Sequence, residues 1–326
     1  LGGYGRSELN PLSDIDVMFL YPSTAKAKDL VKFQEHLSNE ILYPLWDLRL
    51  KIGHSTRTLT EVFAEAGRDI RTKTSLLEAR LIAGSESLYE NFATTYRQHY
   101  LTENPKGYIA ARLTDQGSRR LQHGDTVFMQ EPDLKNGVGG LRDYQNALWM
   151  ARVRLGVTQL DELVDQRYLQ AGELRDFKRA YHFLLRVRNE LHYMSKHPTD
   201  VLNLEIQPGL AANVGYAQPA MLDRVEAFMH DYYGHAQIIY RISKIIEQRL
   251  ALTIAARPGF VGSLKNLLLA RRSERTKRLD GFVIRGRELA AESPTIFQDD
   301  PVRLIRVFRH CQQLECTPDV DLAALI

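Results

Sequence analysis

The residues with the clearest potential for chemistry lie near the start of the chain. Asp14 and Asp16 are separated by one apolar residue within a run that extends to Tyr21 and is bounded by Ser13 and Pro22. This pattern predicts a short buried strand entered from a loop. Because side chains alternate across a strand, the two carboxylates share one face, with their Cα atoms about 6.5–7 Å apart. Two carboxylates in this arrangement can converge on one divalent cation.

A glycine pair, Gly2 and Gly3, precedes these acids by about ten residues. Without Cβ atoms, the pair allows a phosphate group to approach the backbone closely, and a short helix beginning near Gly5 would direct N–H groups at it. An Asp-x-Asp triplet alone is common at solvated strand ends. Coupled to a glycine turn at this spacing, it indicates phosphoryl transfer, in which Mg²⁺ neutralises a nucleoside triphosphate.

The elements that must position these residues follow an α/β order at first and then become helical. Apolar residues at helical spacing from Leu30 to Ile41 predict a helix that ends before Pro44, and residues 45–54 predict a second strand. From about Thr60 onward the pattern is mainly helical. Two apolar stripes, residues 174–191 and 225–246, predict long core helices.

The composition excludes several other classes of protein. Of the 326 residues, 44% are hydrophobic and 25% charged, as in folded globular chains, and no apolar run approaches the length of a membrane span. The net charge of +3 gives no reason to expect nucleic acid or a membrane as partner. Cys311 and Cys316 cannot staple a chain of this size, so we expect a cytoplasmic protein.

The string GGYGRSELNPLSDID at residues 2–16 resembles the signature of the nucleotidyltransferase superfamily, and its expanded form is similar to the GlnD-type family of [protein-PII] uridylyltransferases. Further blocks that are similar to this family follow in the same order, at residues 45–59, 74–84, 131–143, 186–207 and 293–308. The resemblance therefore covers nearly the whole chain. It implies an α+β fold, with a small mixed-sheet domain of the polymerase-beta-like type followed by a mainly helical domain.

The resemblance also implies roles for individual residues. Gly2 and Gly3 would hold the triphosphate together with Arg6 and Ser7, and both Asp14 and Asp16 would be catalytic and bind Mg²⁺ or Mn²⁺. Ser7 stands where the family usually has glycine, which costs little if that position is helical.

The third catalytic carboxylate expected from the resemblance has two candidate positions. Asp47 is the candidate, because it opens the segment 47–51 where the superfamily presents an acid. Alternatively, related sequences carry an acid where this chain has Lys51, and the catalytic set would then be incomplete.

The implied reaction is transfer of UMP from UTP to a tyrosine of the PII signalling protein, with release of pyrophosphate. Two alternatives stay open: a catalytically silent nucleotide-binding regulatory module, or a nucleotidyltransferase with another acceptor, as in adenylylation of glutamine synthetase or nucleotide addition to tRNA.

The resemblance finally predicts a domain organisation. We expect a nucleotidyltransferase domain at 1–115 with a truncated first strand, a helical domain at 116–256 and an α/β extension at 257–326. We further expect a front portion of a longer protein, without the His-Asp phosphohydrolase (HD) and ligand-sensing (ACT) domains of the family. The glycine-rich segment 131–143 lacks the Lys-Ser/Thr of a phosphate loop, and we place its Lys135, Arg142 and Asp143 near the cleft between the first two domains.

Overall fold

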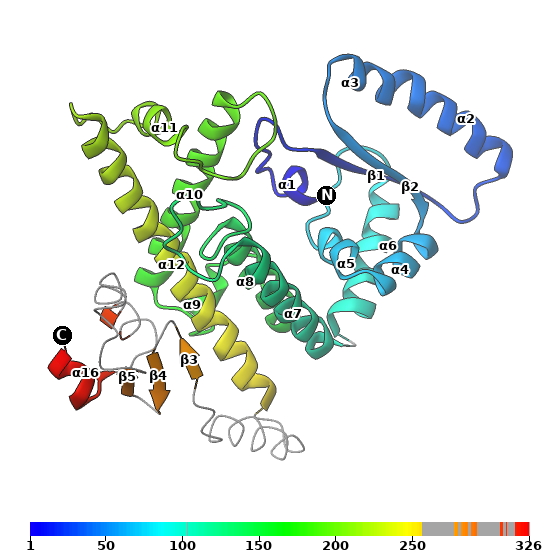
Figure 1. Ribbon diagram of the computed structural model, residues 1–326. Coiled ribbons are helices and arrows are strands. Elements are labelled where there is room, and N and C mark those ends of the chain that lie inside the picture. Colours follow the sequence, from blue (N-terminus) through cyan, green and yellow to red (C-terminus); the bar gives the residue numbers. More distant parts are fainter. Residues whose placement is uncertain are drawn as a thin grey trace. The chain divides into compact units, whose positions relative to one another are not determined.

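The computed structural model describes residues 1–102, 104–255, 277–279, 282–285, 288–291, 307–308, 311 and 317–325 (Figure 1). It divides into two compact units, Leu1–Ile254 and Ala255–Ile326. The first unit combines a small sheet with many helices, which confirms the predicted α+β class. The finer boundary at residue 115 stays a prediction.

The sheet of the first unit has two parallel strands, β1 (Ile15–Tyr21) and β2 (Ile52–Thr58). A short helix, α1 (Gly2–Gly5), precedes β1. The register places Asp16 opposite Gly53 and begins with Ile15 opposite Ile52. The strand predicted from the apolar run is therefore present, although its residues are half-buried rather than fully buried.

The connection between the strands differs from the prediction. Helix α2 (Ala27–Leu37) continues through a π-helical segment, η1 (Ser38–Leu42), into α3 (Tyr43–Asp47). Pro44 does not end the helix, because it occupies the first turn of α3, where its missing N–H needs no partner. The predicted strand at 45–54 was therefore wrong in its start, since β2 begins only at Ile52.

Helices α4 (Leu59–Arg68), α5 (Ile70–Leu76) and α6 (Glu86–Tyr96) follow β2, and a π-helical segment, η2 (Arg97–Thr102), extends α6. Thr58 and Glu61 form a capping box at the start of α4, with the Glu61 carboxylate accepting from the Thr58 N–H at 2.8 Å. A small apolar core joins these helices, comprising Val62, Ala66, Leu76, Phe92 and Tyr96. Figure 1 shows α4 to α6 on one side of the sheet and α2 and α3 on the other.

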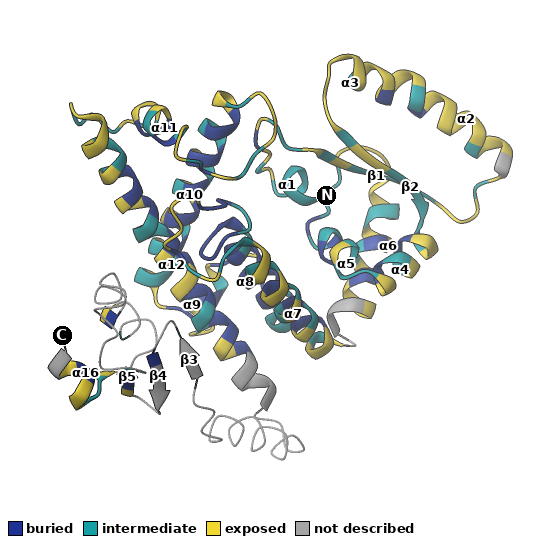
Figure 2. Ribbon diagram, viewed as in Figure 1, coloured by how far each residue is buried: buried dark blue, intermediate teal, exposed yellow. Residues whose placement is uncertain are grey.

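The larger core belongs to the helical part of the first unit. Its helices are α7 (Pro105–His123), α8 (Leu141–Leu155), α9 (Glu162–Asp165), α10 (Ala171–Met194), α11 (Gln207–Asn213) and α12 (Met221–Ala255). Both predicted apolar stripes are confirmed, because they form the buried faces of α10 and α12 (Figure 2). Among their fully buried members are Phe177, Tyr181, Phe228 and Tyr232.

The segment between α1 and β1 is tied to α10 by polar contacts. The Asn10 side-chain amide donates to the Asn189 side-chain oxygen at 2.6 Å, and the Leu12 N–H donates to His192 Nδ1 at 3.1 Å. These bonds join residues about 180 positions apart in sequence. They fix the entry to β1, and thus the carboxylates at its start, against the helical part.

The second unit has a small sheet in the order β3 (Lys277–Leu279), β4 (Phe282–Arg285), β5 (Glu288–Ala291) and β6 (Thr317–Pro318), followed by α16 (Val320–Leu325). Its buried residues include Phe282, Leu289, Val307 and Leu322. The α/β extension expected at 257–326 stays a prediction. The family-like block at 293–308 lies almost entirely outside the described residues, as does Cys316.

Candidate active site

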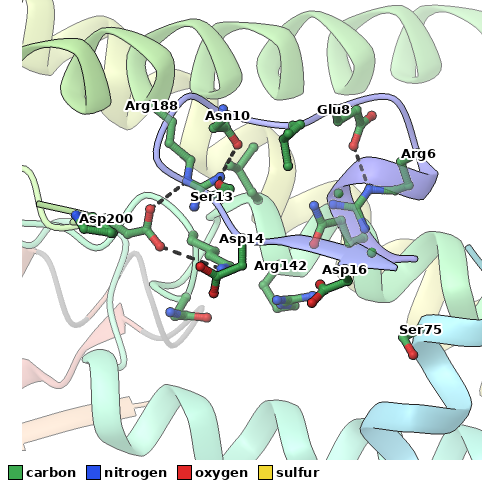
Figure 3. Close-up of a pocket in the computed structure, with 18 of the residues that line it drawn as sticks. Arg6, Glu8, Asn10, Ser13, Asp14, Asp16, Ser75, Arg142, Arg188 and Asp200 are labelled. Carbon is green, nitrogen blue, oxygen red and sulfur yellow. Dashed lines mark hydrogen bonds and ion pairs between the residues drawn. The ribbon is translucent and has the colours of Figure 1, made fainter. Parts of the chain in front are cut away.

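A cavity of about 750 Å³ opens beside the start of β1 (Figure 3). Its walls come from residues 2–16, from α5 and α7, from the glycine-rich segment 131–143, and from α8 and α10. The sheet side of the first unit thus supplies residues 2–16 and α5, and the helical part supplies the other walls. Gly2, Gly3, Arg6, Asp14 and Asp16 all line it, so the structure brings most of the sequence-predicted site residues together.

Asp14 and Asp16 present carboxylates that other side chains leave free. Both residues are exposed toward the cavity, and neither carboxylate has a hydrogen-bond or ion-pair partner in the described part of the chain. Burial raises the pKa of the Asp16 carboxyl, and the negative charge of Asp14 adds to this effect. The positive charges of the N-terminal amino group and Lys135 oppose this effect only in part, and a cationic ligand would compensate the two carboxylates further.

Glycine residues on both sides give the Asp16 carboxylate its room. A Cβ atom at Gly53, across the sheet, would lie 2.7 Å from Asp16 Oδ1, and one at Gly2 would lie 3.2 Å from Asp16 Oδ2. Gly2 also has a φ of +53°, a conformation that favours glycine. The glycine turn therefore positions a carboxylate in addition to lining the cavity.

Ser7 departs from the expectation made for it. Its φ is +62°, which is the left-handed region, so the residue is not helical and the replacement of glycine carries a backbone cost of about 1 kcal/mol. The side chain is exposed and is not among the residues that line the cavity.

Arg6 lines the cavity, but its charge is already balanced. Its guanidinium donates to Glu8 Oε2 at 2.7 Å and to Glu78 Oε2 on the turn after α5. Burial alone would lower the pKa of Arg6, but Glu78 and Glu8 outweigh it and raise the pKa. Trp149 Nε1 donates to the second oxygen of Glu78. Arg6 thus joins the α1 turn to α5 and α8.

Asp47 and Lys51 occupy different environments. Asp47 ends α3, is exposed, and is not among the residues that line the cavity. Lys51 does line it, directly before β2, and its carbonyl accepts the Ile15 N–H at 2.8 Å. A lysine therefore lines the cavity directly before the neighbouring strand. The helical continuation through Pro44 is the reason, because it keeps Asp47 out of the strand.

The donor set fits one hard divalent cation. Two carboxylates on one strand face, at a cavity open to water, match the way Mg²⁺ is bound through one or two carboxylates, waters and substrate phosphates. In the described residues there is no cluster of three or more His, Cys, Asp or Glu side chains that would hold a metal ion without such a substrate.

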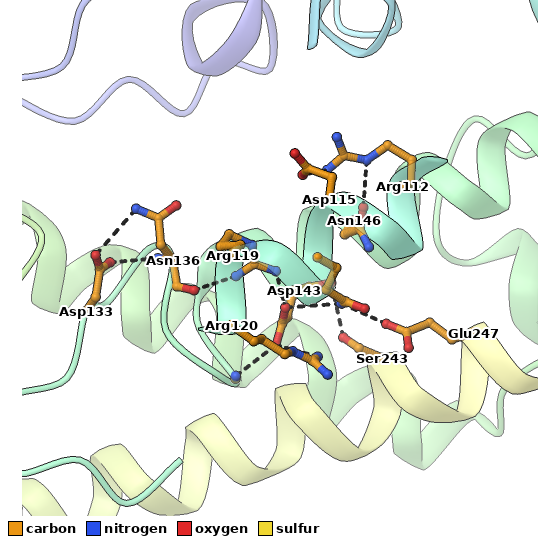
Figure 4. Close-up of polar contacts among 12 residues, drawn as sticks. Arg112, Asp115, Arg119, Arg120, Asp133, Asn136, Asp143, Asn146, Ser243 and Glu247 are labelled. Atoms are coloured by element: carbon orange, nitrogen blue, oxygen red, sulfur yellow. Dashed lines mark hydrogen bonds and ion pairs between the residues drawn. The ribbon is translucent and has the colours of Figure 1, made fainter. Parts of the chain in front are cut away.

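The glycine-rich segment 131–143 reaches the cavity as predicted, with different outcomes for its charged residues. Lys135 and Arg142 line the cavity. Asp143 is fully buried beneath it and accepts from Arg119, from Arg120 at 3.1 Å and from the Gly139 N–H at 2.9 Å (Figure 4). Burial by itself would raise the pKa of the Asp143 carboxyl, but the two arginines outweigh it and lower the pKa. Asp143 is therefore a structural carboxylate.

Sequence reasoning missed a further polar group on the cavity wall. Arg188 of α10 donates to Asp200 Oδ1 at 2.6 Å, to the side-chain oxygen of Asn10 and to Ser13 Oγ at 3.4 Å. Burial would raise the pKa of the Asp200 carboxyl, but bonds from His192 and Arg188 lower it strongly. No local pattern signals this group, because its members lie in three separate segments.

Comparisons with known proteins find similarity to uridylyltransferases. Residues 107–246 match the family described as GlnD PII-uridylyltransferase. A bifunctional uridylyltransferase/uridylyl-removing enzyme from Rhodospirillum rubrum is 35% identical over 98% of this chain and 33% of its own length. Enzymes with the same name from Azospirillum brasilense and Caulobacter vibrioides are 33% and 32% identical, over 98% and 99% of this chain.

The chain spans about a third of the length of these curated relatives. Among the residues that the structure describes, no helix has the length and apolar character needed to cross a membrane.

Proposed function

We propose that this chain, whose residues 107–246 match the GlnD PII-uridylyltransferase family, transfers UMP from UTP to a tyrosine hydroxyl of a PII signalling protein in the cytoplasm. The Asp14–Asp16 pair is the observation that carries the proposal. These carboxylates lie unpaired at a cavity, beside a glycine turn, and on the wall opposite the helical part. A cavity of about 750 Å³ is large enough for a nucleotide.

In the proposed reaction the tyrosine oxygen forms a bond to the α-phosphorus of UTP. The bond from that phosphorus to the oxygen bridging to the β-phosphate breaks, and pyrophosphate leaves with its electron pair. The hydroxyl proton passes to water in the cavity. Asp14 and Asp16 would hold Mg²⁺ or Mn²⁺, which when bound supplies positive charge to the phosphate oxygens.

The chain's own residues prepare this site. Gly2 and Gly53 leave room for the Asp16 carboxylate, and the contacts of Arg188 and Asn10 fix the entry to β1 against the helical part. The two acids are therefore held in place before a ligand arrives, which is the condition for electrostatic catalysis. Arg6 keeps the glycine turn attached to α5 and α8 through Glu78.

The test is transfer of label from [α-³²P]UTP to purified PII protein in the presence of Mg²⁺. We expect Asp16→Asn to lose about three orders of magnitude in rate, since it removes half of the acidic pair. The matched control is Asp176→Asn, a half-exposed aspartate on α10 whose partner is Arg179 in the same helix. Full activity of Asp16→Asn would overturn the assignment, and transfer to another acceptor alone would overturn the choice of PII.

A second candidate function is favoured by Lys51. A lysine beside the acidic pair lowers the negative charge available to a metal ion, as in a nucleotide-binding regulatory module that has lost catalysis. The same preparation distinguishes the two, because such a module would bind UTP with Mg²⁺ in a calorimeter but transfer no label.

A further inference from the structure

The glycine-rich segment 131–143 carries two cationic residues, Lys135 and Arg142, on the helical wall of the cavity. The Arg142 N–H donates to the Lys135 carbonyl at 2.9 Å, so the backbones of these two residues are joined directly. The Asp133 carboxylate accepts from the N–H groups of Lys135, at 2.9 Å, and Asn136, which fixes the start of the turn. Both side chains reach the cavity from this closed loop.

The glycines of the segment allow it to pack closely against its surroundings. Gly139 has a φ of +74°, and a Cβ there would lie 2.2 Å from the Ala236 carbonyl of α12. A Cβ at Gly137 would lie 2.5 Å from the Asp133 carbonyl. The loop is thus packed tightly against itself and against α12, and its cations are positioned in advance.

No acidic side chain forms an ion pair with Arg142 in the described part of the chain, and nearby Glu78 is bound to Arg6 and Trp149. Its guanidinium lies over the Trp149 ring, 5.2 Å from the centroid, and has no hydrogen bond or ion pair to a described residue. Burial and the nearby positive charge of Arg6 lower the pKa of Arg142 to about 10, and the negative charge of Glu78 opposes this effect only in part. Arg119 and Arg120, on the neighbouring helix, differ from it because they share Asp143.

Lys135 is only loosely paired. Its Nζ lies 3.9 Å from Asp200 Oδ2, while Arg188 already holds the other oxygen of that carboxylate at 2.6 Å. Burial lowers the pKa of Lys135, and the negative charge of Asp200 opposes this effect only in part. Figure 3 shows Arg142 at the same cavity as Asp14 and Asp16.

We propose that Lys135 and Arg142 form an anion site on the helical wall that binds the β- and γ-phosphates of the nucleotide and then the departing pyrophosphate. The identity of the anion rests on the function proposed above. As the bond to the α-phosphorus breaks, negative charge accumulates on the leaving group, and arginine and lysine side chains are the usual protein groups that stabilise such charge. The sheet wall would hold the metal ion and the helical wall the leaving group.

The test uses the full 326-residue chain and calorimetric titration with two probes, inorganic pyrophosphate and UMP, each with Mg²⁺. We expect Arg142→Gln and Lys135→Gln each to weaken pyrophosphate binding about tenfold or more, because each loses a charge-assisted hydrogen bond. UMP lacks the β- and γ-phosphates, so its affinity should change by less than about threefold. Arg142→Lys should restore part of the pyrophosphate affinity.

Matched controls are Arg179→Gln and Lys178→Gln, which remove cations from exposed ion pairs on α10. Thermal unfolding establishes that each variant is folded. If Arg142→Gln does not fold, the result for Lys135→Gln decides the outcome. Unchanged pyrophosphate binding in the folded variants would overturn the anion site. An equal loss for UMP and pyrophosphate would overturn it too, because it would mean that these residues only shape the cavity.

The outcome is separable from that of the proposed function. Pyrophosphate binding that depends on Arg142, in a chain that transfers no label to PII, would leave the anion site standing and remove the function. Label transfer that is unaffected in both variants, with unchanged pyrophosphate affinity, would overturn the anion site and leave the proposed function standing.

Discussion

Two groups of carboxylates near the same cavity have opposite surroundings. Asp14 and Asp16, on the sheet wall, are exposed and have no side-chain partner among the described residues. Asp143, behind the helical wall, is fully buried and held by Arg119, Arg120 and a backbone N–H. A balanced, buried charge maintains structure, whereas unbalanced charges at a cavity are available to a ligand.

The same contrast divides the cations. Arg6 and Arg188 are paired with acids and join segments of the chain, while Arg142 has no such partner in the described structure and Lys135 has a distant one. Charge balance therefore separates residues that build the cavity from residues that would act in it, although all four line the same space.

The largest expected effect is a loss of stability when the buried Asp143 carboxylate is removed. Asp143→Asn leaves two half-buried arginines without a carboxylate, and we expect it to lower the free energy of unfolding by about 3–5 kcal/mol. Asp16→Asn should change the same quantity by less than about 0.5 kcal/mol, because it breaks no contact. Urea unfolding followed by circular dichroism measures both, and similar values for the two variants would contradict the distinction.

The pH dependence of this difference has a defined sign. The pKa of Asp143 is lowered in the folded protein, so its contribution to stability is complete above its unfolded value of about 3.9 and is lost as pH falls through the folded value. The stability difference between the unmodified chain and Asp143→Asn should be constant from about pH 5 to 7. It should narrow below about pH 4 in urea unfolding, and a difference that narrows already near pH 6 would contradict this.

A smaller effect, on metal affinity, is expected from a substitution of Lys51. Lys51→Glu adds a third carboxylate beside Asp14 and Asp16 and removes a positive charge. We expect Mn²⁺ affinity, measured by electron paramagnetic resonance of the free ion, to rise about tenfold. Lys32→Glu, on the exposed face of α2, makes the same charge change away from the cavity and serves as the control. Equal gains in both variants would mean that only net charge matters.

The smallest effect is a change in stability from substitutions in the turns at Ser7 and Gly139, one on each side of the cavity. Ser7 has a φ of +62° on the sheet side, whereas the residue with a φ of +74° on the helical side is Gly139, for which this conformation is not strained. We expect Ser7→Gly to raise the free energy of unfolding by about 1 kcal/mol. Gly139→Ala should lower it instead, because its Cβ would lie 2.2 Å from the Ala236 carbonyl. A thermal melt that shows no gain for Ser7→Gly would contradict the strain at that residue.

Much of the fold followed from local pattern. The strand at residues 15–21 and the buried faces of α10 and α12 were predictable, because alternation and helical spacing act over a few neighbouring residues. The end of the helix at Pro44 was not, since proline is compatible with the first turn of a following helix segment as well as with a break. That one difference decides that Lys51, and not Asp47, lies beside the acidic pair.

The sequence by itself determined the chemistry at the start of β1. The spacing of Asp14 and Asp16 places both on one strand face, and the glycines before them remain near in space because they are near in sequence. Only the tertiary structure decided which charges are free. Arg142 and Asp143 are neighbours in sequence, yet one lines the cavity and the other is buried with two arginines of α7. Charge balance depends on partners from distant segments, and no local pattern specifies them.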